Sequence, residues 1–286
     1  MAEHRAGFGD RLVARSQVTS PLCVGIDPST ALLASWGLPD EPESLATFGV
    51  AVVKAVSSSA SAIKPQVAFF ERHGAAGYAA LQSVIEVATA EGLLVIADAK
   101  RGDIDSTMEA YGEAWLSDSS PLAVDALTVT AYLGIGAMGD VIERATRSGR
   151  GLFVVVASSN PEGRTLQEAR VAPGERVEEH LLSELGRRNS EETRSLDRAL
   201  GSLGAVIGAT RSPGSLALPS LEGPLLVPGL GAQGATPHDV AMMTAGCVDG
   251  AVLASASRSI LAAGPDHGSL ARAAETLAEE LRHALG

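Results

Sequence analysis

The sequence is poor in aromatic residues and has no excess of basic charge. Only 3% of its 286 residues are Phe, Trp or Tyr, so a core must be built from Ala, Val, Leu and Ile packed around 31 glycines. An aromatic surface for stacking nucleic-acid bases is therefore not expected. With 22 Lys and Arg against 34 Asp and Glu, the net charge of −12 gives no general attraction for nucleic acid or an anionic membrane. An anionic ligand would have to be held by a local site.

Cysteines and long apolar runs are also scarce. Cys23 and Cys247 stand in apolar stretches without CxxC or Cys/His spacing, and we expect small buried side chains in a reducing compartment rather than a disulfide or zinc ligands. The N-terminus lacks the apolar segment of a signal peptide, and no run of 18 apolar residues occurs. These absences predict a cytoplasmic protein that does not associate with membranes.

Short apolar runs alternate with amphipathic segments along the whole chain. Amphipathic stretches such as Tyr78–Glu91, Thr107–Ser117 and Ser269–Leu285 separate the runs, and this alternation is typical of βαβ units. Several runs are continuously apolar, as expected for parallel strands covered on both faces. Eight strands are predicted, at Leu22–Asp27, Ala62–Pro65, Leu93–Asp98, Ala126–Thr130, Leu152–Ala157, Ala205–Gly208, Leu225–Pro228 and Gly250–Ala254.

Eight such units predict an α/β protein with one (β/α)₈ TIM barrel over residues 1–286, although the length alone would also allow two domains. An N-terminal helix around Phe8–Arg15 could cover the lower end of the barrel. A long charged insertion, Pro161–Leu203, is expected to form a helical excursion after strand five, and its simplest interpretation is a solvated face. The alternative is an open doubly wound sheet, but no GxGxxG follows the first strand.

The segment DAKRGDIDST carries the densest group of charged residues at a strand end, where barrels hold their active sites. Asp98 and Lys100 are two apart and should point to the same side, whereas Asp103 and Thr107 are four apart and should share a helix face. Two carboxylates would keep Lys100 an ammonium, which suits a general acid better than a Schiff-base amine. The simpler alternative is a salt-bridge cluster that closes the turn.

Asp27 and Lys64, at the ends of strands one and two, argue against that simpler alternative. They add two more charges to the same barrel mouth, and burying charges usually costs more stability than it returns. A purely structural role would not explain so many ionisable groups in one place.

A second group of residues follows strands seven and eight, where barrels commonly bind phosphate. PGLGAQG, residues 228–234, is a glycine-rich turn whose backbone N–H groups can donate hydrogen bonds to a phosphate. SASRSI places Arg258 at the end of strand eight. The alternative is a tight turn beside a surface arginine. The two features in this strand order favour a phosphate site.

Together, DAKRGDIDST, PGLGAQG and SRSI resemble the orotidine 5′-phosphate decarboxylase family. PLCVGIDPS and AIKPQVAFFERHG are similar to its subgroup typical of actinobacteria. The core D-x-K-x-x-D also occurs in metal-dependent sugar-phosphate decarboxylases and aldolases, and Ile104, Thr107, Gln233 and IKPQ favour the orotidine enzyme. The resemblance implies conversion of orotidine 5′-monophosphate to UMP by a homodimer without metal or organic cofactor.

The resemblance also implies roles for individual residues. Asp98 would face the substrate carboxylate and Lys100 would protonate C6. Asp27 and Lys64 would bind ribose hydroxyls, with Lys64 completing the charge network. The other implied contacts are Asp103 and Thr107 to the neighbouring subunit's ribose, Ser159 or Ser158 to the pyrimidine, Gln233 and Arg258 to the phosphate, and Ile104 and Pro228 as further substrate-binding residues.

Two positions depart from the family pattern. Thr130–Ala131 stands where relatives often have Asn or Ser followed by Pro, which could alter the loop after strand four. Ser257 replaces a common glycine and could crowd the phosphate.

Two alternative functions are a metal-dependent sugar-phosphate decarboxylase or aldolase, and a phosphate-binding barrel that has lost catalysis.

Overall fold

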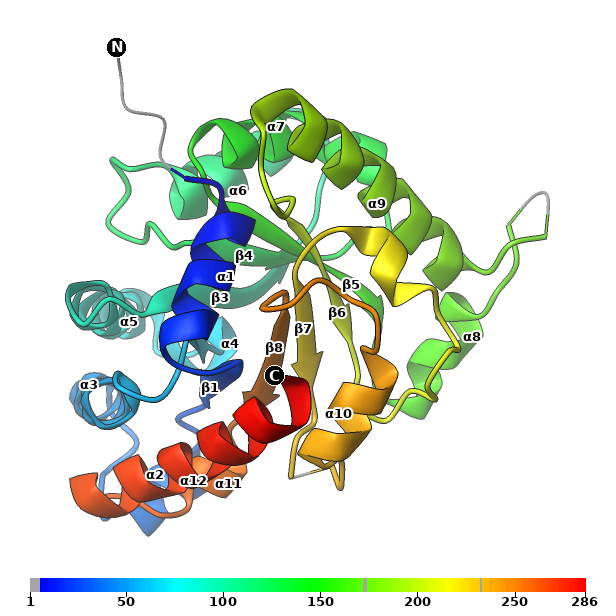
Figure 1. The fold of residues 1–286 in the computed structure, drawn as a ribbon. Coiled ribbons are helices and arrows are strands. Elements are labelled where there is room, and N and C mark those ends of the chain that lie inside the picture. The colour runs from blue at the N-terminus through cyan, green and yellow to red at the C-terminus, as the bar shows by residue number, and fades with distance from the viewer. Residues whose placement is uncertain (1–5, 172–173, 232) are drawn as a thin grey trace.

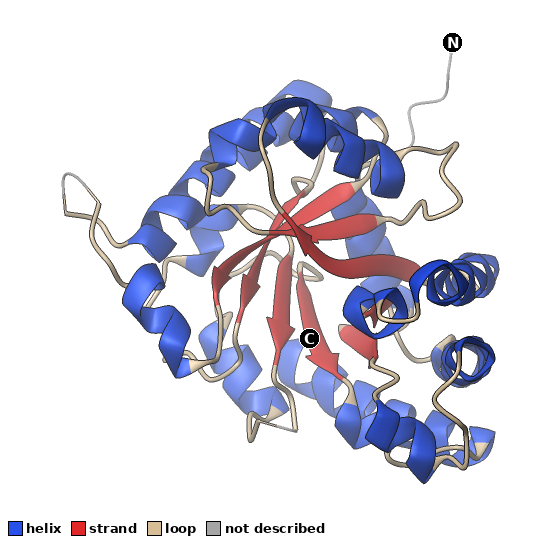
Figure 2. Cartoon of the chain, turned by 180° about the vertical axis from the view of Figure 1, so that it is seen from behind, coloured by secondary structure: helices blue, strands red, loops and turns tan. Residues whose placement is uncertain are grey.

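Eight parallel strands close into a barrel in the order β1 to β8, and the first strand pairs with the last. The computed structural model describes residues 6–171, 174–231 and 233–286. The predicted (β/α)₈ barrel is confirmed, with the strands enclosed by a ring of helices (Figures 1 and 2). The strands are β1 (Leu22–Ile26), β2 (Ala62–Pro65), β3 (Leu94–Arg101), β4 (Ala126–Val129), β5 (Gly151–Ala157), β6 (Leu203–Ile207), β7 (Leu225–Pro228) and β8 (Val252–Ala256).

The helices between the strands cover the outside of the barrel. They are α1 (Phe8–Val18), α2 (Thr30–Ser35), α3 (Pro42–Val56), α4 (Val67–Glu71), α5 (Gly74–Ala90), α6 (Asp105–Leu116), α7 (Gly139–Arg147), α8 (Arg164–Gln167), α9 (Val177–Leu196), α10 (Pro237–Met243), α11 (Arg258–Leu261) and α12 (His267–Leu285). Short 3₁₀ turns lie at Ile135–Met138, Pro161–Gly163 and Leu218–Leu221. Within the described ranges, no helix is long and apolar enough to span a bilayer.

Alternate strand residues divide the apolar core into two parts. Outward-facing side chains such as Val24, Ile63 and Val95 pack against the helices in the larger cluster. The inward-facing residues form a smaller cluster inside the barrel. Because eight strands leave little interior space, most of these residues are small or aliphatic, and only Phe153 among the strand residues is aromatic: Cys23, Ala62, Leu94, Ile96, Ala126, Phe153, Val206, Leu226 and Leu253.

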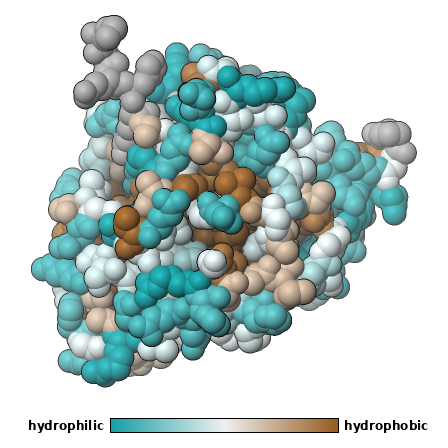
Figure 3. All heavy atoms as spheres, viewed as in Figure 1, coloured by the Kyte–Doolittle hydropathy of each residue, from teal (hydrophilic) through white to brown (hydrophobic). Residues whose placement is uncertain are grey.

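Helix α1 closes the lower end of the barrel, as predicted. Phe8 and Leu12 are fully buried, and the Phe8 ring meets Phe153 edge-on with 5.7 Å between centroids. Gly151 at the start of β5 makes room for this contact, since a Cβ there would lie 2.5 Å from the Phe8 ring. On this face, hydrophobic atoms show at the centre and hydrophilic atoms form most of the rim (Figure 3).

The segment Pro161–Leu203 contains α8 and the longer α9, and α9 is one of the barrel's own outer helices rather than an added excursion. Helix α9 buries Leu182 and Leu185 against the sheet and exposes a charged outer face. Asn189 is fully buried, donates to the carbonyls of Leu203 and Leu221, and accepts from the Leu203 amide. This side chain therefore attaches α9 to the first residue of β6.

Six of the eight strands differ from their predicted bounds by one to three residues at an end, and only β2 and β7 match them; β3 and β8 show two of the causes. Strand β3 continues to Arg101 because a bulge lets it pair again with Val129. Strand β8 begins at Val252 because Gly250, with φ of 80°, lies in a left-handed turn that precedes the strand.

Both cysteines are free thiols. Cys23 is fully buried, and burial raises its pKa to about 12, which fits the predicted small apolar role. Cys247 is only partly buried, and burial raises its pKa to about 11.

We expect Phe8→Ala to lower the free energy of unfolding by about 3–5 kcal/mol, because the plug of the barrel would be replaced by a cavity. Urea unfolding measures the change. Val18→Ala on the same helix is the control, since Val18 is 76% exposed and its truncation should change stability by no more than about 0.5 kcal/mol. Equal effects of the two substitutions would contradict the plugging role.

Candidate active site

Asp98, at the carboxyl end of β3, receives four hydrogen bonds. Its Oδ2 accepts from Lys64 Nζ at 2.8 Å and from Gln66 Nε2 at 3.1 Å. Its Oδ1 accepts from Lys100 Nζ at 2.6 Å and from Thr128 Oγ1 at 3.0 Å. Each carboxylate oxygen therefore has one cationic and one neutral donor. The predicted Asp98–Lys100 and Lys64 cluster is present at the barrel mouth.

The charges of this cluster stabilise one another despite their burial. Asp98 and Lys64 are each 7% exposed. Burial alone would raise the pKa of Asp98, but the Lys64 and Lys100 ammonium groups outweigh it and hold that pKa well below its usual range. Burial alone would lower the pKa of Lys64, but the carboxylates of Asp98 and Asp27 outweigh it and raise that pKa. The site therefore holds an ionised carboxylate between two lysines.

Thr128 was not among the predicted site residues, and Gln66 entered only as part of the IKPQ motif, with no role assigned to it. Both are uncharged, and Thr128 lies inside β4, two residues before the Thr130 position chosen as the strand end. Alternation along β4 could have found it, because Ala126 faces the interior and residue 128 must face the same way.

Asp27 and Lys64 line a cavity of about 140 Å³ together with residues from β7 and β8. Asp27 Oδ2 accepts a hydrogen bond from Ser257 Oγ at 2.5 Å, so this hydroxyl is directed at Asp27. Asp27 Oδ1 is buried and has no hydrogen-bond partner within the described part of the chain. It is an acceptor available to a ligand. The cavity is completed by Pro228, Gly229, Leu230, Gln233, Ser255 and Arg258.

The glycine-rich loop after β7 folds tightly beside this cavity. Gly229, Gly231 and Gly234 all have positive φ, which glycine adopts without strain. A Cβ at Gly229 would lie 2.7 Å from Gln233 Oε1, so glycine lets the amide of Gln233 approach the backbone. Arg258 begins α11 and is exposed at the same cavity. Asp27 and Lys64 from the first predicted group therefore line the same cavity at the barrel mouth as Gln233 and Arg258 from the second.

The two serines after β5 have different surroundings. Ser158 Oγ donates to Asn160 Oδ1 at 2.7 Å and accepts from Gln167 Nε2 at 2.8 Å. The Ser159 hydroxyl makes no hydrogen bond to any residue that the structure describes. The Ser158 hydroxyl is therefore already hydrogen-bonded, whereas that of Ser159 is not bonded to the described residues.

Asp103 does not share a helix face with Thr107, and that prediction is wrong. Helix α6 begins at Asp105, whose φ is 47°, so the chain turns sharply before the helix and Asp103 belongs to the preceding loop. Asp103 Oδ1 accepts from the adjacent Ile104 amide instead of pairing with Lys100. Ile104 and Thr107 are exposed. Among the described residues, the carboxylate that pairs with Lys100 is therefore that of Asp98.

The Thr130 departure is accommodated by the neighbouring turn. The Thr130 amide donates to the Arg101 carbonyl at 2.8 Å. A Cβ at Gly102 would lie 2.6 Å from the carbonyl oxygen and Oγ1 of Thr130, so only glycine fits against this threonine.

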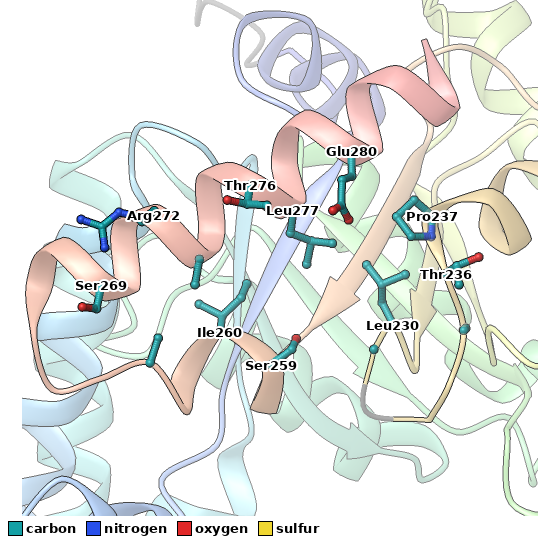
Figure 4. A pocket seen from close by; sticks show the side chains of 14 residues that line it. Leu230, Thr236, Pro237, Ser259, Ile260, Ser269, Arg272, Thr276, Leu277 and Glu280 are labelled. Atoms are coloured by element: carbon teal, nitrogen blue, oxygen red, sulfur yellow. The ribbon is translucent and has the colours of Figure 1, made fainter.

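A larger cleft of about 620 Å³ lies outside the mouth, between the loop after β7, α11 and α12 (Figure 4). Its charged lining residues are Arg272 and Glu280, both on α12. None of the charged residues of the barrel mouth contributes to it. In the described residues, no group of three or more His, Cys, Asp or Glu side chains is placed to hold a metal ion.

The mouth of this (β/α)₈ barrel holds a lysine–aspartate cluster and a glycine-rich loop beside an arginine. These features are typical of barrels that act on phosphorylated small molecules. The model of the orotidine 5′-phosphate decarboxylase / HUMPS family matches residues 20–274, and the chain belongs to this family.

Named relatives cover almost the whole chain. The orotidine 5′-phosphate decarboxylase of Salinispora arenicola is 45% identical over 278 residues, 97% of this chain and 98% of the relative. That of Streptomyces coelicolor has the same identity and coverage. The structure of Leishmania donovani OMP decarboxylase is 28% identical, with a TM-score of 0.76 over 97% of this chain and 98% of that one.

We expect Asp98→Asn to make the free energy of unfolding depend less steeply on pH in the acid range. Because the folded pKa of Asp98 is depressed, its charge stabilises the fold above about pH 4 and this contribution is lost as pH falls. Urea unfolding between pH 3 and pH 6 should show equal slopes above about pH 5 and a wild-type slope steeper by up to about 1.4 kcal/mol per pH unit below about pH 4. The same substitution at exposed Asp140 is the control, and equal slopes for Asp98→Asn and wild type below about pH 4 would contradict the depressed pKa.

Proposed function

We propose that this chain decarboxylates orotidine 5′-monophosphate to UMP and CO₂, as one barrel domain per subunit, in de novo pyrimidine biosynthesis. Membership of the family and near full-length similarity to relatives of that name support the reaction. The observation that carries the proposal is the Asp98 carboxylate fixed between Lys64 and Lys100 at the barrel mouth. Both substrate and product are phosphorylated nucleotides of intracellular metabolism, so we place the enzyme in the cytoplasm.

In the proposed reaction, the bond between C6 and the carboxylate carbon breaks and its electron pair stays on C6. Lys100 then delivers a proton to C6, and solvent later returns a proton to the lysine. The Lys100 ammonium would stabilise the negative charge as it develops on C6, and this interaction is stronger in the transition state than in the ground state. Asp98 would lie beside the departing carboxylate, where the repulsion between the two anions is relieved as CO₂ leaves.

The remaining contacts would bind parts of the substrate that do not react. Lys64 and Asp27 Oδ1, which has no hydrogen-bond partner among the described residues, suit ribose hydroxyls. Arg258 and Gln233 suit the phosphate, with backbone N–H groups of the loop after Pro228. Ser159 would contact the pyrimidine. Binding energy from the phosphate would help to align the base over Lys100.

We also propose a homodimer with shared active sites. Ile104, Tyr132 and Leu133 are large apolar side chains that are 49%, 79% and 54% exposed. They lie on the loops after β3 and β4, which touch through Gly102 and Thr130. An apolar patch of this kind beside the mouth is typical of a subunit interface. Asp103 and Thr107 stand next to it and would reach the partner's ribose.

Lys100→Ala should lower kcat for orotidine 5′-monophosphate by at least about a thousandfold while the barrel stays folded, because the proton donor and its charge are both lost. A spectrophotometric decarboxylation assay with chelator present measures this, and circular dichroism checks the fold. Lys54→Ala, on helix α3, is a matched control and should retain wild-type kcat. Turnover by wild type only with added Mg²⁺, on a keto-sugar phosphate, would contradict the proposal.

Mixing inactive variants tests the shared site. Lys100→Ala and Asp103→Ala subunits, unfolded together and refolded, should regain about a quarter of wild-type activity, because half the dimers are mixed and each has one intact site. Light scattering should report a dimer for the wild type. A monomeric wild type, or no regained activity from folded mixed dimers, would contradict the shared site.

A further inference from the structure

The Thr128 hydroxyl joins the two charged residues of the D-x-K segment. Thr128 is 1% exposed, and its Oγ1 lies 3.0 Å from Asp98 Oδ1 and 2.9 Å from the backbone nitrogen of Lys100. The Lys100 amide can only donate, so the hydroxyl accepts from it and gives its own proton to Asp98. The direction of both hydrogen bonds is therefore fixed by chemistry.

The backbone of Lys100 needs such an anchor. Its φ is 47°, a left-handed conformation that residues other than glycine rarely adopt and that surrounding contacts must maintain. The side chain is long and 48% exposed, so packing alone does not hold it. Its described hydrogen bonds are at the two ends: Nζ to Asp98 and the backbone nitrogen to Thr128.

Thr128 is connected to both of these ends. It binds the Lys100 backbone directly, and it shares Asp98 Oδ1 with the Lys100 ammonium. On the other oxygen, Gln66 and Lys64 form the corresponding pair of donors. Without the Thr128 hydroxyl, Oδ1 would lose its neutral donor, and the carboxylate and the lysine could shift together.

We propose that Thr128 is a positioning residue for proton delivery: it holds Asp98 and Lys100 in the geometry that aims the ammonium at the reacting carbon. This inference rests on the proposed decarboxylation. Thr128 acts through its two neighbours and needs no contact with substrate. Its effect should therefore fall on the chemical step and leave binding of the ribose and phosphate to β1, β7 and β8 unchanged.

The test compares Thr128→Val with Thr128→Ser. Valine keeps the branched shape and removes the hydroxyl, whereas serine keeps the hydroxyl. We expect Thr128→Val to lower kcat about 10- to 100-fold, as small misplacements of reacting groups do, with KM within about threefold of wild type. Thr128→Ser should recover kcat to within about fivefold of wild type. Inhibition by the product UMP, which has no carboxylate, should be equally strong in all three proteins.

Thr244→Val is the matched control. Thr244 is also buried, at 5% exposure, and its hydroxyl donates to the Val240 carbonyl at the end of α10. Removing it should leave kcat at the wild-type value. The positioning role would be wrong if Thr128→Val had the wild-type kcat, or if its KM rose and its inhibition by UMP weakened in parallel with the fall in kcat. The proposed function would stand in either case. A wild type without decarboxylase activity would overturn both.

Discussion

The ionised carboxylate of Asp98 is the interaction on which the barrel mouth depends. A buried charge is tolerated only when it is paired and hydrogen-bonded, and Asp98 meets this condition through four donors from β2, β3, β4 and the residue after β2. Because these donors come from three adjacent strands, barrel closure assembles the network. Closing the sheet therefore brings these charged groups together and also stabilises the fold.

The two ends of the barrel serve different purposes. At the lower end, Phe8 and Phe153 fill the interior with close apolar packing. At the upper end, inward-facing positions carry Lys64, Asp98 and Thr128 in place of aliphatic side chains. The low aromatic content fits this division, since the narrow interior has room for few rings and the mouth is lined by charged and hydrogen-bonding side chains.

The sequence was sufficient for the strands and for the charged residues at their ends. Short apolar or β-branched runs ending in Gly, Pro, Asp, Ser or Thr marked all eight strands, and several of these runs were continuously apolar. Asp27, Lys64 and Asp98 followed because the carboxyl ends of parallel strands meet at one edge. The shape of the turn after β3 was not predictable, because it depends on the long-range pairing of Arg101 with Val129 and on the left-handed backbone of Asp105. Thr128 was not predicted, because a neutral residue inside a strand belongs to no recognisable motif. Its contacts with Asp98 and Lys100 form only when β3 and β4 lie side by side.

The position of the C-terminal helix has a practical consequence for handling the protein. Helix α12 ends beside α1, where Arg282 donates to the Thr19 carbonyl and Leu285 lies near Gln17 and Pro21. Gly286 lines the same cavity as Pro21 and Gly250, which precede β1 and β8, so the last residue lies at the end of the barrel where the strands start. Asp98 lies toward the other end of the barrel, in the second half of β3. A fluorophore, affinity peptide or surface linker attached there would leave the charged mouth open, and immobilised protein would present that mouth to solution.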